Sequence, residues 1–355
     1  MEKNNSITYR IAGQDTAAEQ LAIYNKVFSE AGKPENWLRK HYGNPVSAEP
    51  KLFGAFDGDK LVGINGFLEM NYAYGNVNFR VVQSCDTAVD PDYRGRGIFT
   101  RLIRSAEAEF RDQGYDAMIG FPNFNSHPGF LKMGWLEMLR SSKLFLPANV
   151  RNMIRHMKGI DLTPVSNAAA WVLWHPMRKY ARKAKDVELE RRDSVTLEEY
   201  ERCVDPDYIR FTPDERTLQW KLHDLIGYYV ARVSGREAAR IIVTAYDYGD
   251  ALRRANVIVV SCGEGDEEIL RGALAKVLLS IRKDYDMICI WQPLKEKIAG
   301  VLKQLGFMDN IATKQGSPFI IRILTEDPQK KLILSNPSLW NPTQIETDTM
   351  INLNN

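Results

Sequence analysis

The most informative part of the sequence is CDTAVDPDYRGRG, residues 85–97. It reads as the end of a β-strand, a proline-containing turn, two glycines one residue apart, and the start of a helix. Gly95 and Gly97 permit positive φ angles and let a ligand approach the backbone closely. Free N–H groups at a helix N-terminus favour a phosphate or diphosphate, and Arg94 and Arg96 add positive charge beside them. The stretch therefore predicts a diphosphate-binding turn.

The sequence around this turn predicts a mixed, mostly antiparallel sheet flanked by helices, an α/β (α+β) arrangement. Apolar alternation predicts strands before the turn, and helical spacing of apolar residues predicts a helix after it. The predicted strands are residues 6–12, 51–56, 61–72, 78–89, 117–121 and 136–146, and the predicted helices are 15–31, 35–42, 98–113 and 128–133.

The same order of elements returns in the second half of the chain, which predicts an internal structural duplication. The predicted strands there are residues 227–233, 238–247, 252–260, 287–291 and 319–324, and the predicted helices are 197–203, 267–284 and 294–305. We therefore divide the chain into an N-terminal domain 1–147, a linker 148–186, a C-terminal domain 187–325 and a polar tail 326–355 anchored by Trp340.

The linker is strongly basic, with eight Lys and Arg residues against two Asp residues over 147–186. We expect two helices there, residues 150–158 and 168–183, with Trp171 and Trp174 among the charges. One interpretation is a solvated connector whose tryptophans pack between the domains. The other is a patch for an anionic substrate or a membrane surface, because basic amphipathic helices with Trp bind anionic lipid.

The second half lacks a diphosphate-binding turn at the corresponding place. Residues 261–268 read SCGEGDEE, with four carboxylates at a predicted helix start. These charges stabilise the helix N-terminus but repel a diphosphate. We therefore expect the C-terminal domain not to bind a diphosphate ligand.

Composition excludes several classes of protein. The chain has 355 residues, enough for two domains, and a net charge of +2, which argues against nucleic-acid binding. Its four cysteines form no C-x-x-C pair and its five histidines form no ligand cluster, so we expect no metal. Residues 1–12 lack the apolar core of a signal peptide, and no apolar run approaches about 20 residues. We expect a cytoplasmic protein without a transmembrane segment, as a monomer or homodimer.

The turn resembles the signature Arg-Gly-x-Gly-x-Gly/Ala of the GNAT superfamily of N-acyltransferases. Arg94 through Ile98 match this signature, and Phe99 stands where Gly or Ala is usual. Residues 130–135, FLKMGW, are similar to the family's Phe/Tyr-x-Lys-Leu-Gly-Phe ending. Asn123 falls where such proteins often place a polar residue near the cofactor. The resemblance covers residues 50–146 by motif and 190–325 by architecture, and it implies two tandem GNAT-like domains.

The resemblance implies that acetyl-CoA or another acyl-CoA is the co-substrate. Its pantetheine would pair with the strand before the turn, and its diphosphate would lie on the amides of the turn. The residues implied are Cys85, Asp86, Thr87, Val89, Arg94, Gly95, Arg96, Gly97, Ile98, Phe99, Thr100 and Asn123.

The resemblance also implies a general acid and a base for the transfer. Members of the family often use a Tyr at the position of Phe130, which carries no proton to donate. We therefore consider His127 and Asp86, the latter as acid, base or substrate anchor, and Glu69 as the base.

The predicted function is an N-acetyltransferase that moves an acetyl or acyl group to a primary amine of a small acceptor by direct attack in a ternary complex. The positive charge of the linker is compatible with an acceptor that carries a negative charge, but it does not establish one. Two alternatives remain: a non-catalytic GNAT-fold binding protein, and an aminoacyl transferase that takes its donor from charged tRNA.

Overall fold

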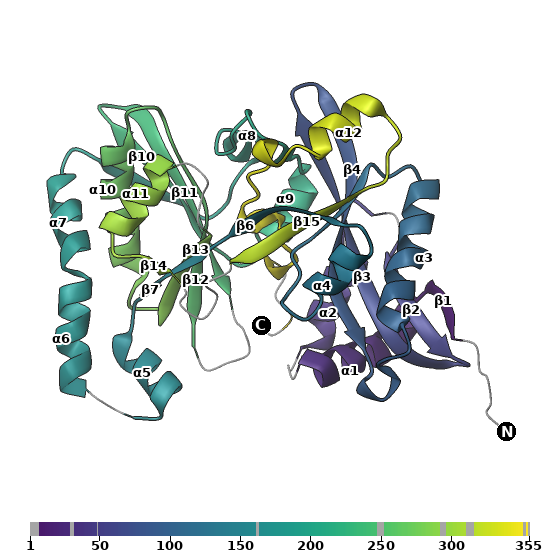
Figure 1. The fold of residues 1–355 in the computed structure, drawn as a ribbon. Coiled ribbons are helices and arrows are strands. Elements are labelled where there is room, and N and C mark those ends of the chain that lie inside the picture. The colour runs from purple at the N-terminus through teal and green to yellow at the C-terminus, as the bar shows by residue number, and fades with distance from the viewer. Residues whose placement is uncertain are drawn as a thin grey trace.

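The computed structural model describes residues 7–28, 32–47, 49–160, 163–246, 252–291, 296–309, 316–350 and 353. The expected helix end at residues 29–31 and most of the last five residues lie outside these ranges. Two mixed sheets stand side by side, each flanked by helices (Figure 1). The predicted fold class, with two mostly antiparallel sheets, is confirmed.

The first sheet runs in the order β1-β2-β3-β4-β5-β15-β6, and β9 pairs with β3. Its one parallel pair among the described residues is β4 with β5. The strands are β1 (Thr8–Ile11), β2 (Leu52–Asp57), β3 (Lys60–Tyr74), β4 (Val77–Val89), β5 (Ala117–Gly120), β6 (Leu136–Ser141), β9 (Arg210–Phe211) and β15 (Ser317–Ile323).

The second sheet runs in the order β14-β7-β13-β12-β11-β10-β8. Its parallel pair, among the residues with assigned positions, is β12 with β13, so it repeats the pattern of the first sheet. The strands are β7 (Lys143–Pro147), β8 (Glu188–Arg192), β10 (Leu225–Val233), β11 (Arg236–Tyr246), β12 (Arg254–Cys262), β13 (Met287–Trp291) and β14 (Met308–Asp309).

The two sheets exchange a strand, which the sequence did not predict. The single strand expected over 136–146 is two strands, β6 in the first sheet and β7 in the second. The strand expected to close the second sheet is β15, which lies between β5 and β6 of the first sheet. Hydrophobic alternation identifies a strand but not its neighbour, because β15 has apolar residues suited to either core. The domain limits 1–147 and 187–325 stay a prediction.

Side-chain alternation gives the first sheet two apolar faces. On β2, Phe53 and Ala55 join the core under α3, while Leu52 and Phe56 join the core under α1 and α2. Its helices are α1 (Ala17–Phe28), α2 (Pro34–Tyr42), α3 (Ile98–Asp112) and α4 (His127–Lys132), with short 3-10 turns η1 (Gln14–Thr16) and η2 (Pro91–Tyr93).

The second sheet is covered mainly by α10, whose buried face packs with α7 and α11 on strands β11 to β13. The remaining helices follow the chain to its end. They are α5 (Val150–Lys158), α6 (Thr163–Leu173), α7 (His175–Lys183), α8 (Leu197–Glu201), α9 (Glu215–Lys221), α10 (Glu267–Ile281), α11 (Glu296–Gln304) and α12 (Pro328–Leu334), then η4 (Pro337–Leu339), η5 (Gln344–Glu346) and η6 (Asp348–Met350).

A shared apolar core joins the two sheets and the tail. Tyr72 of β3, Ile242 of β11 and Ile258 of β12 belong to it, together with Trp340 and Ile345. The tail is therefore held at several points rather than by Trp340 alone, since Ile345, Met350 and Leu353 are buried as well.

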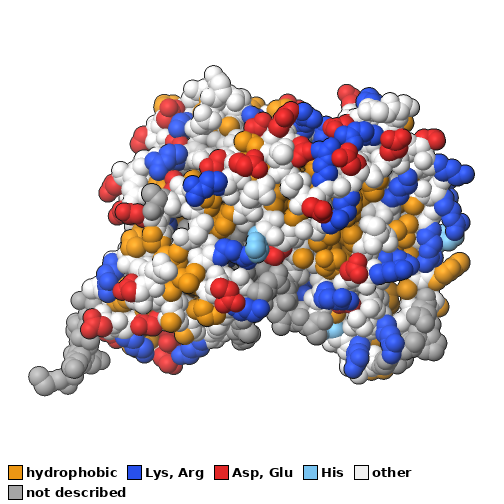
Figure 2. Space-filling model, turned by 180° about the vertical axis from the view of Figure 1, so that it is seen from behind, with side chains coloured by type: hydrophobic (Ala, Val, Ile, Leu, Met, Phe, Trp, Pro, Cys, Tyr) orange, Lys and Arg blue, Asp and Glu red, His pale blue; other side chains and the backbone are white. Residues whose placement is uncertain are grey.

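The linker forms a helical edge of the molecule, where Lys and Arg side chains gather (Figure 2). Its two tryptophans have different environments. Trp174 is fully buried in the core of the second sheet and donates to the Pro147 carbonyl oxygen at 3.0 Å, whereas Trp171 is 60% exposed. Among the described residues, no helix combines the length and apolar character that a membrane crossing needs.

The strand exchange predicts that residues 1–147 do not fold alone, because β5 and β6 then lack the strand between them. In urea, monitored by circular dichroism, this fragment should show no cooperative transition. A matched chain of residues 1–141 joined by a flexible linker to 316–355 restores β15 and should unfold cooperatively. Cooperative unfolding of the shorter fragment would contradict the requirement for β15.

Candidate functional site

The turn after β4 has the backbone geometry that two glycines permit. Asp90 accepts a hydrogen bond from the N–H of Asp92 at 3.0 Å, which starts η2. Gly95 and Gly97 then take φ angles of 76° and 74°, in the left-handed region, and a side chain at either would point into open space. The loop therefore opens toward solvent immediately before α3 begins at Ile98.

The N-terminus of α3 is suited to an anion. Gly97 caps it without a side chain, and its first turn contains no acidic residue, so the first N–H groups have no side-chain acceptor there. Arg94 and Arg96 flank these groups, and the Arg96 guanidinium lies 4.7 Å from the centre of the Tyr93 ring. The positive end of the helix dipole, free N–H groups and two cationic side chains therefore lie at the same place, an arrangement suited to binding a diphosphate.

A cavity of about 890 Å³ lies beside this turn, where β4 and β5 part. The last paired residues of the two strands are Ser84 and Gly120, and beyond them the strands separate. We call this space the β4–β5 cavity. The expected ligand-binding residues that line it are Cys85, Asp86, Thr87, Val89, Arg94, Phe99 and Asn123.

The other residues of the predicted turn do not line the cavity wall. The Ile98 side chain is buried in the core under α3, and Thr100 is exposed on the helix. Gly95, Arg96 and Gly97 are exposed at the rim, where they contribute backbone and charge.

Phe99 lies at the side of the cavity rather than in the turn. Its ring packs edge-on against Phe130, with centroids 5.2 Å apart. The packing requires Gly129, because a Cβ there would come within 2.7 Å of the Phe99 ring. Asn123 has a local structural role as well: its Oδ1 accepts hydrogen bonds from the N–H groups of Asn125 and Ser126 at 3.0 and 3.1 Å, just before α4.

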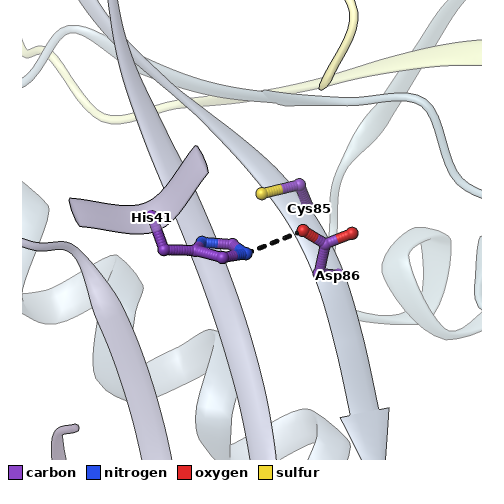
Figure 3. Close-up of side chains that lie close together, drawn as sticks. All are labelled: His41, Cys85 and Asp86. Carbon is purple, nitrogen blue, oxygen red and sulfur yellow. Dashed lines mark ion pairs between the residues drawn. The ribbon is translucent and has the colours of Figure 1, made fainter. Parts of the chain in front are cut away.

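Asp86 is the most constrained residue of the cavity. It has a φ of 47°, one of two positive values at non-glycine residues in the described chain. Its Oδ2 lies 2.7 Å from Lys40 Nζ and 2.9 Å from His41 Nε2, both from α2, and the Asp86 side chain is 7% exposed. Figure 3 shows the other carboxylate oxygen turned away from His41. A strained residue held by buried partners is typical of a functional site.

The charge states of this cluster follow from burial and proximity. Burial raises the pKa of Asp86, but Lys40 and His41 outweigh it and hold that pKa below its usual value. Burial lowers the pKa of Lys40, yet Asp86 and Asp348 more than compensate and raise it. Burial lowers the pKa of His41, so the imidazole is neutral near pH 7. Asp86 is ionised and Lys40 is charged.

The C-terminal tail completes the cavity, which sequence reasoning missed. Asp348 Oδ2 lies 3.1 Å from Lys40 Nζ, and Thr349 and Leu353 line the wall. The Lys33 N–H donates to the Leu353 carbonyl oxygen at 2.8 Å, which ties the tail to α2. Lys40, His41 and the tail residues carry no local signal, because they meet Asp86 only through tertiary packing.

His41, Cys85 and Asp86 are close enough to form a metal site, with candidate ligand atoms within 4.8 Å of one another (Figure 3). Two features oppose a divalent cation. The Lys40 ammonium already occupies Asp86 Oδ2, and burial raises the pKa of Cys85 well above its usual value, which keeps the thiol protonated.

The other two catalytic candidates lie outside the cavity lining. His127 Nε2 is 2.8 Å from Glu137 Oε2 on β6. Glu69 is buried on β3, with its carboxylate 3.3 Å from Arg80 Nη2. Of the three candidates, the structure brings Asp86 alone to the β4–β5 cavity.

Comparisons with known proteins agree with this arrangement. Residues 8–137 match the family model described as an acetyltransferase (GNAT) domain. A GCN5-related N-acetyltransferase from Anabaena variabilis is similar in structure, with a TM-score of 0.58 and 13% identity over 90% of this chain and 73% of that chain. The protein of that description from Kribbella flavida gives a TM-score of 0.58 and 13% identity over 90% of this chain and 71% of that one.

A third similar structure is the glucosamine N-acetyltransferase region of a fungal multi-domain β-N-acetylglucosaminidase. Its TM-score is 0.59, at 15% identity over 90% of this chain and 38% of that chain. At these identities the likeness concerns the fold. The sequence matches no curated protein at a significant level.

The buried ion pair predicts a large cost for removing one partner. Lys40→Met leaves the Asp86 carboxylate without its main counter-charge, so we expect a loss of about 3–5 kcal/mol in the free energy of unfolding. Lys40→Met combined with Asp86→Asn should lose clearly less, because the most deeply buried carboxylate charge is then removed together with its partner, and the remaining carboxylate, Asp348, is partly exposed. Urea unfolding at pH 7 measures both. Equal losses in the single and double variants would show that the pair is not coupled.

Proposed function

We propose that the chain, whose residues 8–137 match the acetyltransferase (GNAT) domain model, transfers an acyl group from acetyl-CoA, or another acyl-CoA, to a primary amine of a small acceptor. The observation that carries the proposal is the meeting of an uncapped, cation-flanked helix N-terminus with a cavity between two parting strands.

The residues of the turn fit the diphosphate of coenzyme A. In the proposal, the N–H groups from Arg94 to Phe99 bind the diphosphate, with the Arg94 and Arg96 charges beside it. The pantetheine follows the free edge of β4 after Ser84, where Cys85, Thr87 and Val89 line the cavity. This edge has unpaired backbone groups because β5 ends at Gly120.

The transfer is a direct attack. The neutral amine nitrogen attacks the thioester carbonyl carbon, the C–N bond forms and the C–S bond breaks. The nitrogen, positively charged after the attack, releases one proton, and the departing thiolate takes one up, so that the products are the amide and free coenzyme A. Backbone N–H groups on the parted strand stabilise the oxyanion that develops, a contribution commonly of about 3 kcal/mol.

Asp86 serves as the anchor of the acceptor. Its lowered pKa makes it a weak base, and Lys40 and His41 hold its Oδ2. The other oxygen of the ionised carboxylate is offered at the cavity wall to the N–H of the neutral amine. Lys40 and His41 fix its position. Phe130, buried between Phe99 and Trp135, has no proton for the leaving thiolate, and we assign no general acid.

The C-terminal sheet acts as a wall of the acceptor space in this proposal, since Tyr246 of β11 and the tail residues Asp348 and Thr349 line the same cavity. The four cysteines are free thiols, which suits a reducing compartment such as the cytoplasm.

Acetyl-CoA should stabilise the protein. At 100 times its Kd, a ligand that binds only the folded state adds about 2.7 kcal/mol, which raises the thermal midpoint by a few degrees. Gly97→Trp blocks the turn and should abolish the shift. Gly265→Trp is the matched control, because Gly265 also has a positive φ and open space before the helix of the second half.

The same assay separates the alternatives. No shift with any acyl-CoA, but a shift with charged tRNA, would overturn the proposal in favour of an aminoacyl transferase. A shift with acetyl-CoA, without release of free thiol across a set of amines that includes glucosamine, would favour a non-catalytic binding protein.

Asp86→Asn should weaken binding of the acceptor amine but not binding of acetyl-CoA. Losing one charge-assisted hydrogen bond costs about 1.5–3 kcal/mol, so KM for the amine should rise about 10- to 150-fold, with the Kd of acetyl-CoA unchanged. His127→Gln and Glu69→Gln, outside the cavity lining, should leave both constants near wild type. A larger effect from either control than from Asp86→Asn would reassign the anchor. Steady-state kinetics and calorimetry provide the two constants.

A further inference from the structure

A second cavity, of about 590 Å³, lies where β12 and β13 part in the second sheet. Their last paired residues are Val257 and Ile290, beyond which β12 continues to Cys262 and β13 ends at Trp291. This β12–β13 cavity stands in the second sheet where the β4–β5 cavity stands in the first. Its volume is that of an ordinary small-molecule site.

The β12–β13 cavity differs from the first in charge. Among the described residues, the carboxylates of Asp205, Glu264 and Glu267 line it, together with the guanidinium of Arg210. The nearby helix α10 begins with Glu267 and Glu268, so its N-terminus is occupied by acidic side chains. A diphosphate is repelled here, and a cation is attracted.

A fourth carboxylate, Glu346 of the tail, also lines the cavity. Burial raises the pKa of Glu346 to about 7, and the Thr343 N–H donates a hydrogen bond to it. The acidic character of the cavity therefore depends mainly on the other three carboxylates.

Buried polar atoms in the lining that have no hydrogen-bond partner among the described residues include Trp291 Nε1 and Gln344 Oε1. The Trp291 and Gln344 residues are 8% and 3% exposed. An unsatisfied buried donor or acceptor costs about 1–3 kcal/mol in folding free energy, so a ligand that hydrogen-bonds to both atoms recovers that cost on binding. These two atoms are one donor and one acceptor.

The rest of the wall is apolar and aromatic. Tyr200, Phe211 and Ile258 are buried in the shared core and border the space. Aromatic faces beside carboxylates favour an organic cation with an apolar body, through burial of apolar surface and cation–π attraction.

We propose that the β12–β13 cavity is a second binding site, which takes a small organic amine with an apolar body and one ammonium group. The ammonium meets the acidic mouth near Glu264, and the body lies against the aromatic wall. The site is separate from the acyl-CoA site, because the described linings of the two cavities share no residue. The cavities are neighbours, since the ring of Phe121 in the first lining lies 5.3 Å from the ring of Trp291 in the second.

Calorimetric titration of the full chain with 2-phenylethylamine tests the proposal. The matched probes are 3-phenylpropanoate, which has a carboxylate instead, and 2-phenylethanol, which is neutral. We expect saturable binding of the amine at this site, at least about tenfold tighter than binding of the carboxylate, because the charges at the mouth change from attractive to repulsive. Saturable binding of the carboxylate with equal affinity would overturn the proposal, as would no saturable binding of the amine.

Variants locate the site. Ser261→Phe places a ring in the β12–β13 cavity and should abolish binding of 2-phenylethylamine. Glu264→Gln changes only an exposed mouth residue, so it tests the charge without risk to folding, and it should weaken binding about threefold or more. Gly97→Trp, which blocks the acyl-CoA turn, and Asp86→Asn, which changes the proposed acceptor anchor, should both leave this binding unchanged. Binding that survives both Ser261→Phe and Glu264→Gln, or that Gly97→Trp abolishes, would contradict a separate site.

Discussion

Strand β15 pairs through its backbone with β5 on one side and with β6 on the other, and this pairing holds the edge of the ligand cavity in the first sheet. A ligand cavity forms between β4 and β5 because these strands part after Ser84 and Gly120. Parting strands expose backbone groups on both sides, and β5, only four residues long, would have little to hold it. β15 hydrogen-bonds to β5 along its other side, so the opening can exist without freeing the strand. The second sheet uses β7 in the same way beside β13.

The charge cluster around Asp86 also includes a residue of the C-terminal tail, Asp348. After β15 the tail passes through the shared core and brings Asp348 to Lys40, so one ammonium faces two carboxylates. Taking such charges out of water is costly unless each is paired, and here α2, β4 and η6 each contribute a partner. The result is an ionised carboxylate that two partners from α2 hold in place at the cavity wall.

Much of this fold could be predicted from local pattern, and the rest could not for identifiable reasons. The turn at Gly95 and Gly97, the helix after it and β13 were predicted within a residue or two, because backbone conformation and side-chain period determine them. The exchange of β7 and β15 was missed, since a strand's neighbours are set by the whole chain. Asp86 was identified as a candidate, but Lys40, His41 and Asp348 were not. These three residues matter because they pair with partners far away in the sequence, and nothing in the local sequence distinguishes them from polar residues of the surface.

The exchanged strand has a consequence for synthesis on the ribosome. Residues up to Ser141 emerge first, yet their sheet stays open until β15 has left the exit tunnel. At ordinary elongation speeds, the roughly 180 intervening residues take about 10–40 s to make. During that interval the edges of β5 and β6 are available to chaperones or to wrong partners. The sheet that contains the N-terminal strands is therefore completed after the second sheet, and the speed of translation affects how much of the protein folds correctly.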